Sequence, residues 1–304
     1  MDKRFNRIAM LFSTLFLVML VFAVAAFFYG LNLGSKKVEA KYAHLTETDE
    51  SPVDYAYLQQ DLASFYVTVY APYREFQLAW NEALRKIANR EVSNVASLYK
   101  EIEGQASKKA EDAASYNLQH AGMLGQAQQS YIRSLNQFEK VAASLQKRDA
   151  AATYDDIQKA LQNNESYISA VSQALTGQDL FYRSMYEWGV SIDPNIPTEI
   201  DKNVSQNLSV WSTYPLLVKN EIIASYLLEK KIFADYLPQD LVSSIDMFIH
   251  SGQAETMNIT TVEGIISLLA NTSAVRPGDY NLNRNKLYLD EFLPQIPFFY
   301  PNVD

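Results

Sequence analysis

The chain contains no cysteine among its 304 residues, which excludes disulfides, thiolate metal ligands and a cysteine nucleophile. Exported eukaryotic domains of this size commonly carry disulfides, so the absence fits a bacterial cell envelope or the interior of a cell. Histidine is also scarce, with three residues at His44, His120 and His250. No histidine or cysteine stands three or four residues from His120, so we expect a hydrogen-bonded core residue there and not a metal ligand.

The sequence motifs of common enzyme classes are missing as well. The chain has no H-E-x-x-H, no G-x-S-x-G, no P-loop and no G-x-G-x-x-G pattern. Two carboxylate pairs, Asp155 with Asp156 and Glu101 with Glu103, fall on amphipathic helical patterns, so we expect them to face solvent and not a catalytic cleft. These absences predict a protein that is not an enzyme, with no catalytic residue, no metal site and no cofactor.

One segment approaches the spacing of a calcium loop. Oxygen-bearing side chains stand at positions 1, 3, 5, 7 and 12 of such a loop, at Asp279, Asn281, Asn283, Asn285 and Asp290. Arg284 occupies position 6, where a glycine makes the sharp turn, and Arg276-Pro277-Gly278 precedes the segment where a helix should stand. We therefore expect an Asn-rich turn without calcium, because asparagine bonds its own backbone in loops.

Basic residues are too few and too scattered for a nucleic-acid site. The formal net charge is −9, and the first seven residues contribute +2, which leaves −11 for the remainder. Beyond the N-terminal segment no run of Lys and Arg is longer than a pair. Such a domain would repel a phosphate backbone, so nucleic acid is excluded as an expected partner.

One long hydrophobic run is present, at residues 8–33, and it contains no charged side chain. A helix rises about 1.5 Å per residue, so this run can cross the roughly 30 Å of membrane hydrocarbon. We expect residues 8–33 to contact membrane lipid as a single-pass signal anchor. The alternative is a cleaved signal peptide, because Ala23-Val24-Ala25 has a small-x-small pattern; cleavage there would leave an apolar stub, which favours a retained anchor.

Positive charge near the two ends of the run does not fix its orientation. Three Lys or Arg residues precede it and three follow it, at Lys3, Arg4, Arg7, Lys36, Lys37 and Lys41. A short basic tail before the first apolar run is typical of a cytoplasmic N-terminus, so we expect an extracytoplasmic C-terminal domain at the cell membrane. The inverted orientation would instead give a membrane-tethered cytoplasmic scaffold.

Three long runs of apolar residues at three- and four-residue steps predict helices that pack as an elongated antiparallel bundle. The first covers residues 58–102, with a bend at Pro72 and an end at Gly104. The second covers 113–145, with a break or bend at 122–125. The third covers 154–175 and is interrupted or ended at Thr176-Gly177, with the polar Asn164 on its apolar stripe as a candidate determinant of helix register.

The character of the chain changes at residues 193–197, where prolines and Asn195 indicate a loop. We expect four parts: a basic tail and anchor at 1–34, a polar stalk at 35–51, the bundle at 52–190, and a smaller helical subdomain at 191–304. Shorter helices are predicted at 216–236, 239–250 and 261–269. The aromatic and proline-rich tail at 292–301 cannot form a regular helix; it either packs back on the helices, which we favour, or serves as a docking peptide.

These observations predict an all-α protein in the cell envelope that acts as a non-enzymatic scaffold or interaction module for another protein. The alternative is a ligand-binding sensor module working with a partner subunit, which is less favoured because the cytoplasmic tail would be only about seven residues long. Homo-oligomer formation is left open by the residues. The identity of the partner protein cannot be read from them.

Overall fold

The computed structural model describes residues 57–118, 122–146 and 154–300. The described residues form helices and loops, with one isolated β-bridge between Asn207 and Thr261 and no strand, which confirms the all-α fold class. The predicted anchor at 8–33 and stalk at 35–51 lie outside these ranges. Within them, no helix combines the length and the apolar character needed to span a bilayer.

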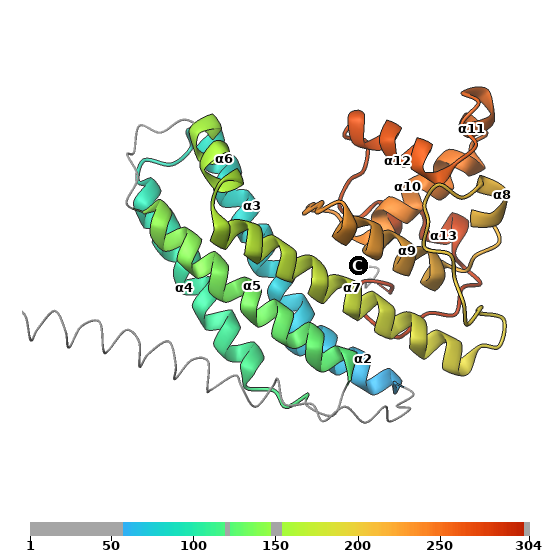
Figure 1. Ribbon diagram of the computed structural model, residues 1–304, viewed down its shortest axis with the longest axis horizontal. Helices are drawn as coiled ribbons and strands as arrows, with labels where there is room; N and C mark the ends of the chain where they lie inside the picture. Colours follow the sequence, from blue (N-terminus) through green and yellow to red (C-terminus); the bar gives the residue numbers. More distant parts are fainter. Residues whose placement is uncertain (1–56, 119–121, 147–153, 301–304) are drawn as a thin grey trace, which may run out of the picture. The chain divides into compact units, whose positions relative to one another are not determined.

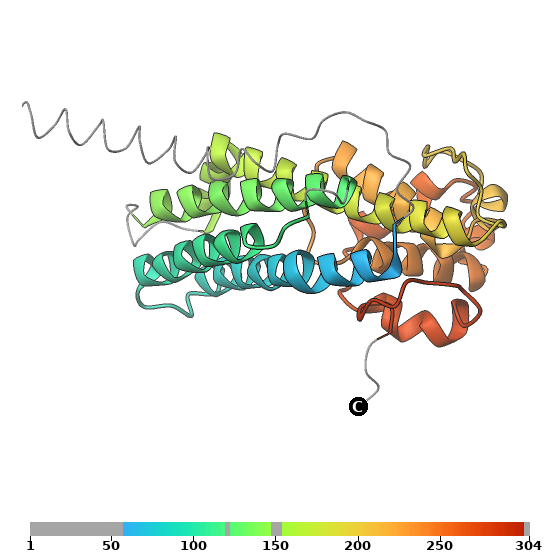
Figure 2. The ribbon, with the colours of Figure 1, turned by 90° about the horizontal axis from the view of Figure 1, so that it is seen from below.

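Long helices packed side by side form the bundle. The first is a continuous helical path through α2 (Gln59–Phe65), the π-helical turn η1 (Tyr66–Tyr70) and α3 (Ala71–Ala88). It is followed by α4 (Val95–Ala114), α5 (Met123–Leu145), the short α6 (Tyr154–Gln162) and α7 (Glu165–Ile192). Figure 1 shows that α4, α5 and α7 run alternately in opposite directions, and Figure 2 shows the same helices from below.

The first predicted helix, at 58–102, is wrong in its extent. The path continues past Pro72, and the π-helical turn directly before it is the local response to a residue that lacks an N–H and crowds the preceding turn. The helix then ends at Ala88, and Arg90 takes a left-handed backbone conformation with φ +57°. Asn94 begins α4 by accepting a hydrogen bond from the Ser97 N–H at 3.0 Å, so α4 runs through Gly104 and does not end there.

The predicted break near residues 122–125 is confirmed. The helix α4 ends at Ala114 and α5 begins at Met123, directly after Gly122, whose φ is +50°. The Met123 N–H donates to the Tyr57 hydroxyl oxygen at 2.9 Å, which ties the start of α5 to the start of the bundle.

The third predicted helix, at 154–175, is in fact two helices, α6 and α7, and the chain leaves the helical path between them at residues 163–164. Asn164 does not face the apolar core as a register residue; it is the N-cap of α7 and accepts a hydrogen bond from the Tyr167 N–H at 3.0 Å. Thr176-Gly177 does not end the helix, because α7 continues to Ile192. Gly177 is instead a packing residue: a Cβ at this position would lie 3.0 Å from the Tyr131 ring.

The remaining helices pack against α7 through α9. They are α8 (Leu208–Trp211), α9 (Leu216–Glu229), α10 (Pro238–His250), α11 (Gln253–Thr256), α12 (Val262–Asn271) and α13 (Asp279–Leu287). The predicted helices at 239–250 and 261–269 are confirmed by α10 and α12. The predicted helix at 216–236 is too long, because Lys231 adopts a left-handed φ of +55° and the chain leaves the helix after Glu229.

Aromatic rings pack together in the bundle, and the half-buried Phe298 of the C-terminal tail packs against them. Phe298 lies with its ring centroid 5.4 Å from that of Tyr66, 5.9 Å from Tyr70 and 6.2 Å from Tyr182. Leu293, Ile296 and Phe299 of the same tail are buried. Over residues 292–300, the expectation that the tail is not a regular helix and packs back on the helical body is therefore confirmed.

Candidate functional site

The residues singled out in the sequence do not gather into one site. His44 and His120 lie outside the described ranges, and His250 is exposed in the last turn of α10. Asp155 and Asp156 are exposed near the start of α6, as expected. Glu101 is exposed on α4, whereas Glu103 is half-buried and accepts a hydrogen bond from the Gln146 side-chain amide.

The segment with calcium-loop spacing is a helix and not a loop. Residues 279–287 form α13, so neither the calcium loop nor the Asn-rich turn is present. Asp279 Oδ2 accepts hydrogen bonds from the Arg276 N–H at 2.8 Å and the Ser244 hydroxyl at 3.0 Å, and the Asn283 amide donates to Ser243 at 3.0 Å. These side chains tie α13 to α10. Among the described residues, no group of three or more His, Cys, Asp or Glu side chains could hold a metal ion.

A buried ion pair links the C-terminal helices. Lys219 Nζ lies 3.1 and 2.9 Å from the two carboxylate oxygens of Asp246, and the Trp211 indole N–H and the Tyr288 hydroxyl each donate to the same carboxylate at 2.7 Å. Burial and the Asp246 charge raise the pKa of Tyr288, which keeps this hydroxyl protonated as a donor. Because every group of the pair has partners, its role is to hold α8, α9, α10 and the segment after α13 together.

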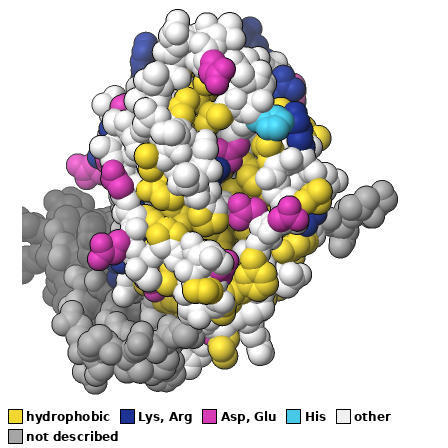
Figure 3. All heavy atoms as spheres, turned by 90° about the vertical axis from the view of Figure 1, so that its right-hand side faces the viewer, with side chains coloured by type: hydrophobic (Ala, Val, Ile, Leu, Met, Phe, Trp, Pro, Cys, Tyr) yellow, Lys and Arg dark blue, Asp and Glu magenta, His cyan; other side chains and the backbone are white. Residues whose placement is uncertain are grey.

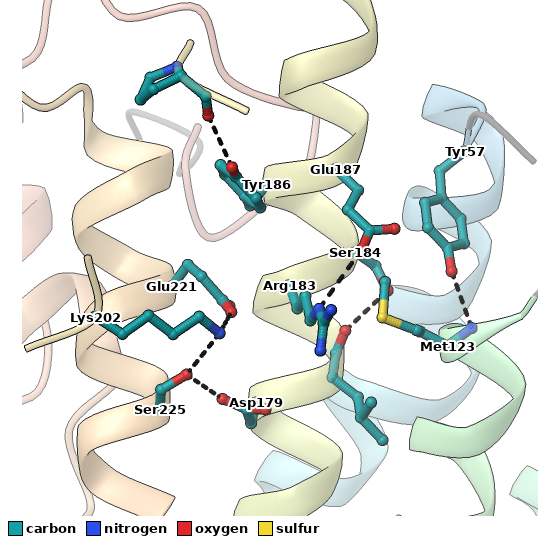
Figure 4. A network of polar contacts seen from close by, with 12 residues as sticks. Tyr57, Met123, Asp179, Arg183, Ser184, Tyr186, Glu187, Lys202, Glu221 and Ser225 are labelled. Carbon is teal, nitrogen blue, oxygen red and sulfur yellow. Dashed lines mark hydrogen bonds and ion pairs between the residues drawn. The ribbon is translucent and has the colours of Figure 1, made fainter. Parts of the chain in front are cut away.

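A second polar network lies between α7 and α9. Lys202, from the loop after α7, pairs with Glu221 and donates to the Ser225 hydroxyl at 3.1 Å, and Ser225 donates to Asp179 at 2.7 Å. Figure 4 shows these four side chains facing one another across the two helices. Glu221 Oε2 is buried and receives no hydrogen bond from the described residues. Burial, opposed by Lys202, raises the pKa of Glu221 to about 7.

A carboxyl group that titrates near neutral pH is a candidate acid or base, but Glu221 is not accessible to a substrate. None of its side chain is exposed, whereas 40% of the Lys202 side chain is. A cleft lined by Tyr73, Gln77 and Tyr236, among others, lies where the loop after α9 meets α3, and it has room for about one water molecule. The Gln77 side chain donates to the Ala234 carbonyl at 2.8 Å and holds this loop in place. Neither feature is shaped for a small-molecule reaction.

The feature with the clearest potential for recognition is an exposed apolar surface that we name the Phe292 patch, formed by Ile192, Leu289 and Phe292. Their exposed fractions are 45%, 67% and 58%. The Phe292 ring stacks on that of Trp188, with centroids 5.6 Å apart and planes 12° from parallel. Ile192 follows Trp188 by one helical turn, so the patch joins the end of α7 to the turn after α13.

The Phe292 patch has carboxylates beside it. Asp193 follows Ile192, and Asp290 and Glu291 lie between Leu289 and Phe292. Burial raises the pKa of Glu291. The Leu216 N–H and the Lys219 charge oppose this rise, and the charges of Asp246 and Asp193 add to it, so Lys219 as well as Asp193 lies near Glu291. Figure 3 shows the side of the molecule on which α8, α11 and the end of α7 lie; hydrophobic side chains spread across its middle with Asp and Glu side chains among them.

The sequence identified only part of these features. Phe292 belongs to the tail that was a candidate docking peptide, but Ile192 and Leu289 carried no signal, because their exposure depends on tertiary packing. Lys219 and Glu221 did carry such a signal, because apolar residues flank them on both sides within α9, so a charged residue in this part of the helix is expected to be buried and paired. No family model, curated protein or solved structure matches the chain.

Proposed function

We propose that the chain is a membrane-anchored, extracytoplasmic helical protein that binds another protein and is not an enzyme. The observation that carries the proposal is the Phe292 patch, because its three large apolar side chains are exposed on two segments that the Trp188–Phe292 stack joins, and exposed apolar surface of this kind is typical of protein interaction sites. Residues 8–33 supply the expected tether to the cell membrane.

The Phe292 patch rests on a rigid support. Trp188, directly beneath Phe292, is buried, and the Glu291 carboxylate accepts a hydrogen bond from the Leu216 N–H at 3.1 Å. Tyr288, at the start of the same turn, is held by Asp246. A surface fixed in this way loses little conformational freedom when a partner covers it, which favours binding.

Affinity capture tests the binding function. The full-length chain with a C-terminal tag is recovered from host membranes in mild detergent as the wild type, as the L289S/F292S double variant, and as the control variant L282S. Leu282 is 81% exposed on α13 and lies outside the Phe292 patch. We expect a protein recovered in amounts comparable to the tagged chain from the wild type and the control, and lost from the double variant. Identical recovery from all three would overturn the proposal.

Protease accessibility of a C-terminal tag tests the location. Cells stripped of wall or outer membrane are treated with protease while a cytoplasmic protein is followed as a control. Digestion of the tag with the cytoplasmic control intact is the expected result. Protection of the tag until the membrane is lysed would instead establish a cytoplasmic scaffold.

A further inference from the structure

We propose that the partner of the Phe292 patch is a basic amphipathic protein segment, with large apolar side chains that cover Ile192, Leu289 and Phe292 and with Lys or Arg side chains that meet Asp193 and Asp290. This inference rests on the proposed function and names the class of partner that the same surface would bind.

Ile192, Leu289 and Phe292 form the apolar half of the surface. Phe292 presents one ring face to Trp188, so its 58% exposed fraction belongs to its edge and its other face. Leu289 lies within a turn in which the Glu291 N–H donates to the Tyr288 carbonyl, and Phe292 directly follows that turn. A partner that inserts its own apolar side chains here would remove all three patch residues from water. The outer ring face is also a surface on which an Arg or Lys cation can stack.

The charged half of the surface is formed by the acidic residues that stand next to the patch residues in the sequence. Segments 188–193 and 288–292, which carry the Phe292 patch, contain Asp193, Asp290 and Glu291 and no Lys or Arg. Neither Asp193 nor Asp290 forms an ion pair with a described cation. The Asn195 backbone N–H and side-chain amide donate to Asp193 Oδ1 at 2.9 and 2.8 Å, which fixes the position of that carboxylate. A partner with Lys or Arg at its margin supplies the missing counter-charge.

The same charges disfavour the other occupants. In a symmetric dimer through this surface, the patch of one copy would meet the identical patch of the other, and their carboxylates would repel one another. An anionic lipid surface and nucleic acid are disfavoured for the same reason. A segment of another protein that combines apolar and basic side chains satisfies both halves of the surface.

Site-specific photocrosslinking tests the inference. A photoreactive amino acid replaces Leu289 in the full-length chain, which is irradiated in its host, and the crosslinked peptide is identified by mass spectrometry. We expect one major adduct whose crosslinked peptide carries large apolar residues with Lys or Arg. We also expect D290K to lower the adduct yield about fivefold or more, because like charges then face each other.

The matched control for this charge reversal is E101K. Glu101 is exposed on α4, away from the end of α7, so the same change of charge should leave the adduct yield unaltered. The inference is overturned by an adduct with a second copy of the chain, by a crosslinked peptide without Lys or Arg, or by an equal yield with D290K.

The two proposals fail in different ways. If the partner is lost from L289S/F292S but the peptide crosslinked at position 289 carries no Lys or Arg, the inference about the chemistry of the partner fails and the binding function stands. If recovery is identical from all three forms and position 289 yields no adduct, both fail together.

Discussion

Replacing Glu221 by glutamine should stabilise the protein at alkaline pH and leave it little changed at acidic pH. Burial raises the pKa of Glu221 from its ordinary value of 4.5 to about 7. Glutamine has the same shape and keeps an oxygen that can accept a hydrogen bond from Lys202, but it carries no charge to bury.

The magnitude follows from the difference between the folded and unfolded pKa. A group whose pKa is raised on folding leaves stability intact below its unfolded pKa and lowers it as the pH rises through its folded pKa. The rise of Glu221 corresponds to roughly 3 kcal/mol, most of which is lost from the wild type between pH 5 and pH 8. This raised pKa already includes the attraction of Lys202, so we expect E221Q to be more stable than the wild type by about 2 to 3 kcal/mol at pH 8.

Urea unfolding of the full-length chain in mild detergent, followed by tryptophan fluorescence at pH 5, 6.5 and 8, measures this directly. Other buried carboxyls titrate in both proteins, so the difference between E221Q and the wild type isolates Glu221. The control variant is E229Q, on the same helix, because 71% of the Glu229 side chain is exposed. If the free energies of unfolding of E221Q and the wild type differ by the same amount at pH 5 and at pH 8, the buried charge of Glu221 does not lower the stability of the wild type.

Four further substitutions should change stability in stated directions. Gly177→Ala should cost about 1 to 3 kcal/mol in urea unfolding, because the added Cβ meets a buried aromatic ring, whereas Gly104→Ala should gain about 0.5 to 1 kcal/mol, because nothing lies within 4 Å of that Cβ; equal effects would contradict the packing argument. Lys219→Met should cost about 3 to 5 kcal/mol by leaving the Asp246 carboxylate buried without its cation, and it should lower the melting temperature in a circular dichroism scan. A loss below about 1 kcal/mol would mean that the pair is effectively solvated. Phe298→Ala should cost about 1 to 2 kcal/mol, because it removes a half-buried ring that packs on Tyr66, Tyr70 and Tyr182, and an unchanged midpoint of thermal unfolding would show that these ring contacts do not stabilise the protein.

The existence of most long helices could be predicted from the sequence, but their ends could not. Spacing of Leu62, Phe65, Val69, Phe76 and Trp80 predicts one buried helix face, and all five are buried. The break after Ala88 was missed because apolar spacing continues across it, and because the left-handed residue is an arginine, not a glycine.

The roles of Asn164 and Gly177 in the third predicted helix were also wrong, because they depend on neighbouring structure that the sequence pattern does not show. Asn164 lies in phase with the apolar stripe, and only its hydrogen bond to the Tyr167 N–H distinguishes an N-cap from a buried register residue. A glycine within a helical pattern is typical of a helix end. At Gly177, however, the ring of Tyr131 from the neighbouring α5 occupies the space that a side chain at position 177 would need. Both distinctions depend on tertiary structure.

The candidate site was less predictable than the fold. Phe292 could be singled out as part of an aromatic tail, but its stacking on Trp188, and the approach of Asp193 to Glu291, join segments about 100 residues apart in the sequence. Glu221 could have been found from its place between apolar residues of α9.

The position of Phe298 among the bundle rings also determines how the domain can be divided. This ring comes from the end of the described chain, yet it contacts Tyr66 and Tyr70 from its beginning. A cut in the exposed loop at residues 201–203 would therefore leave two fragments that each lack part of one shared core. Such fragments should not fold separately but should reassemble when mixed, as the two halves of a single cooperative unit.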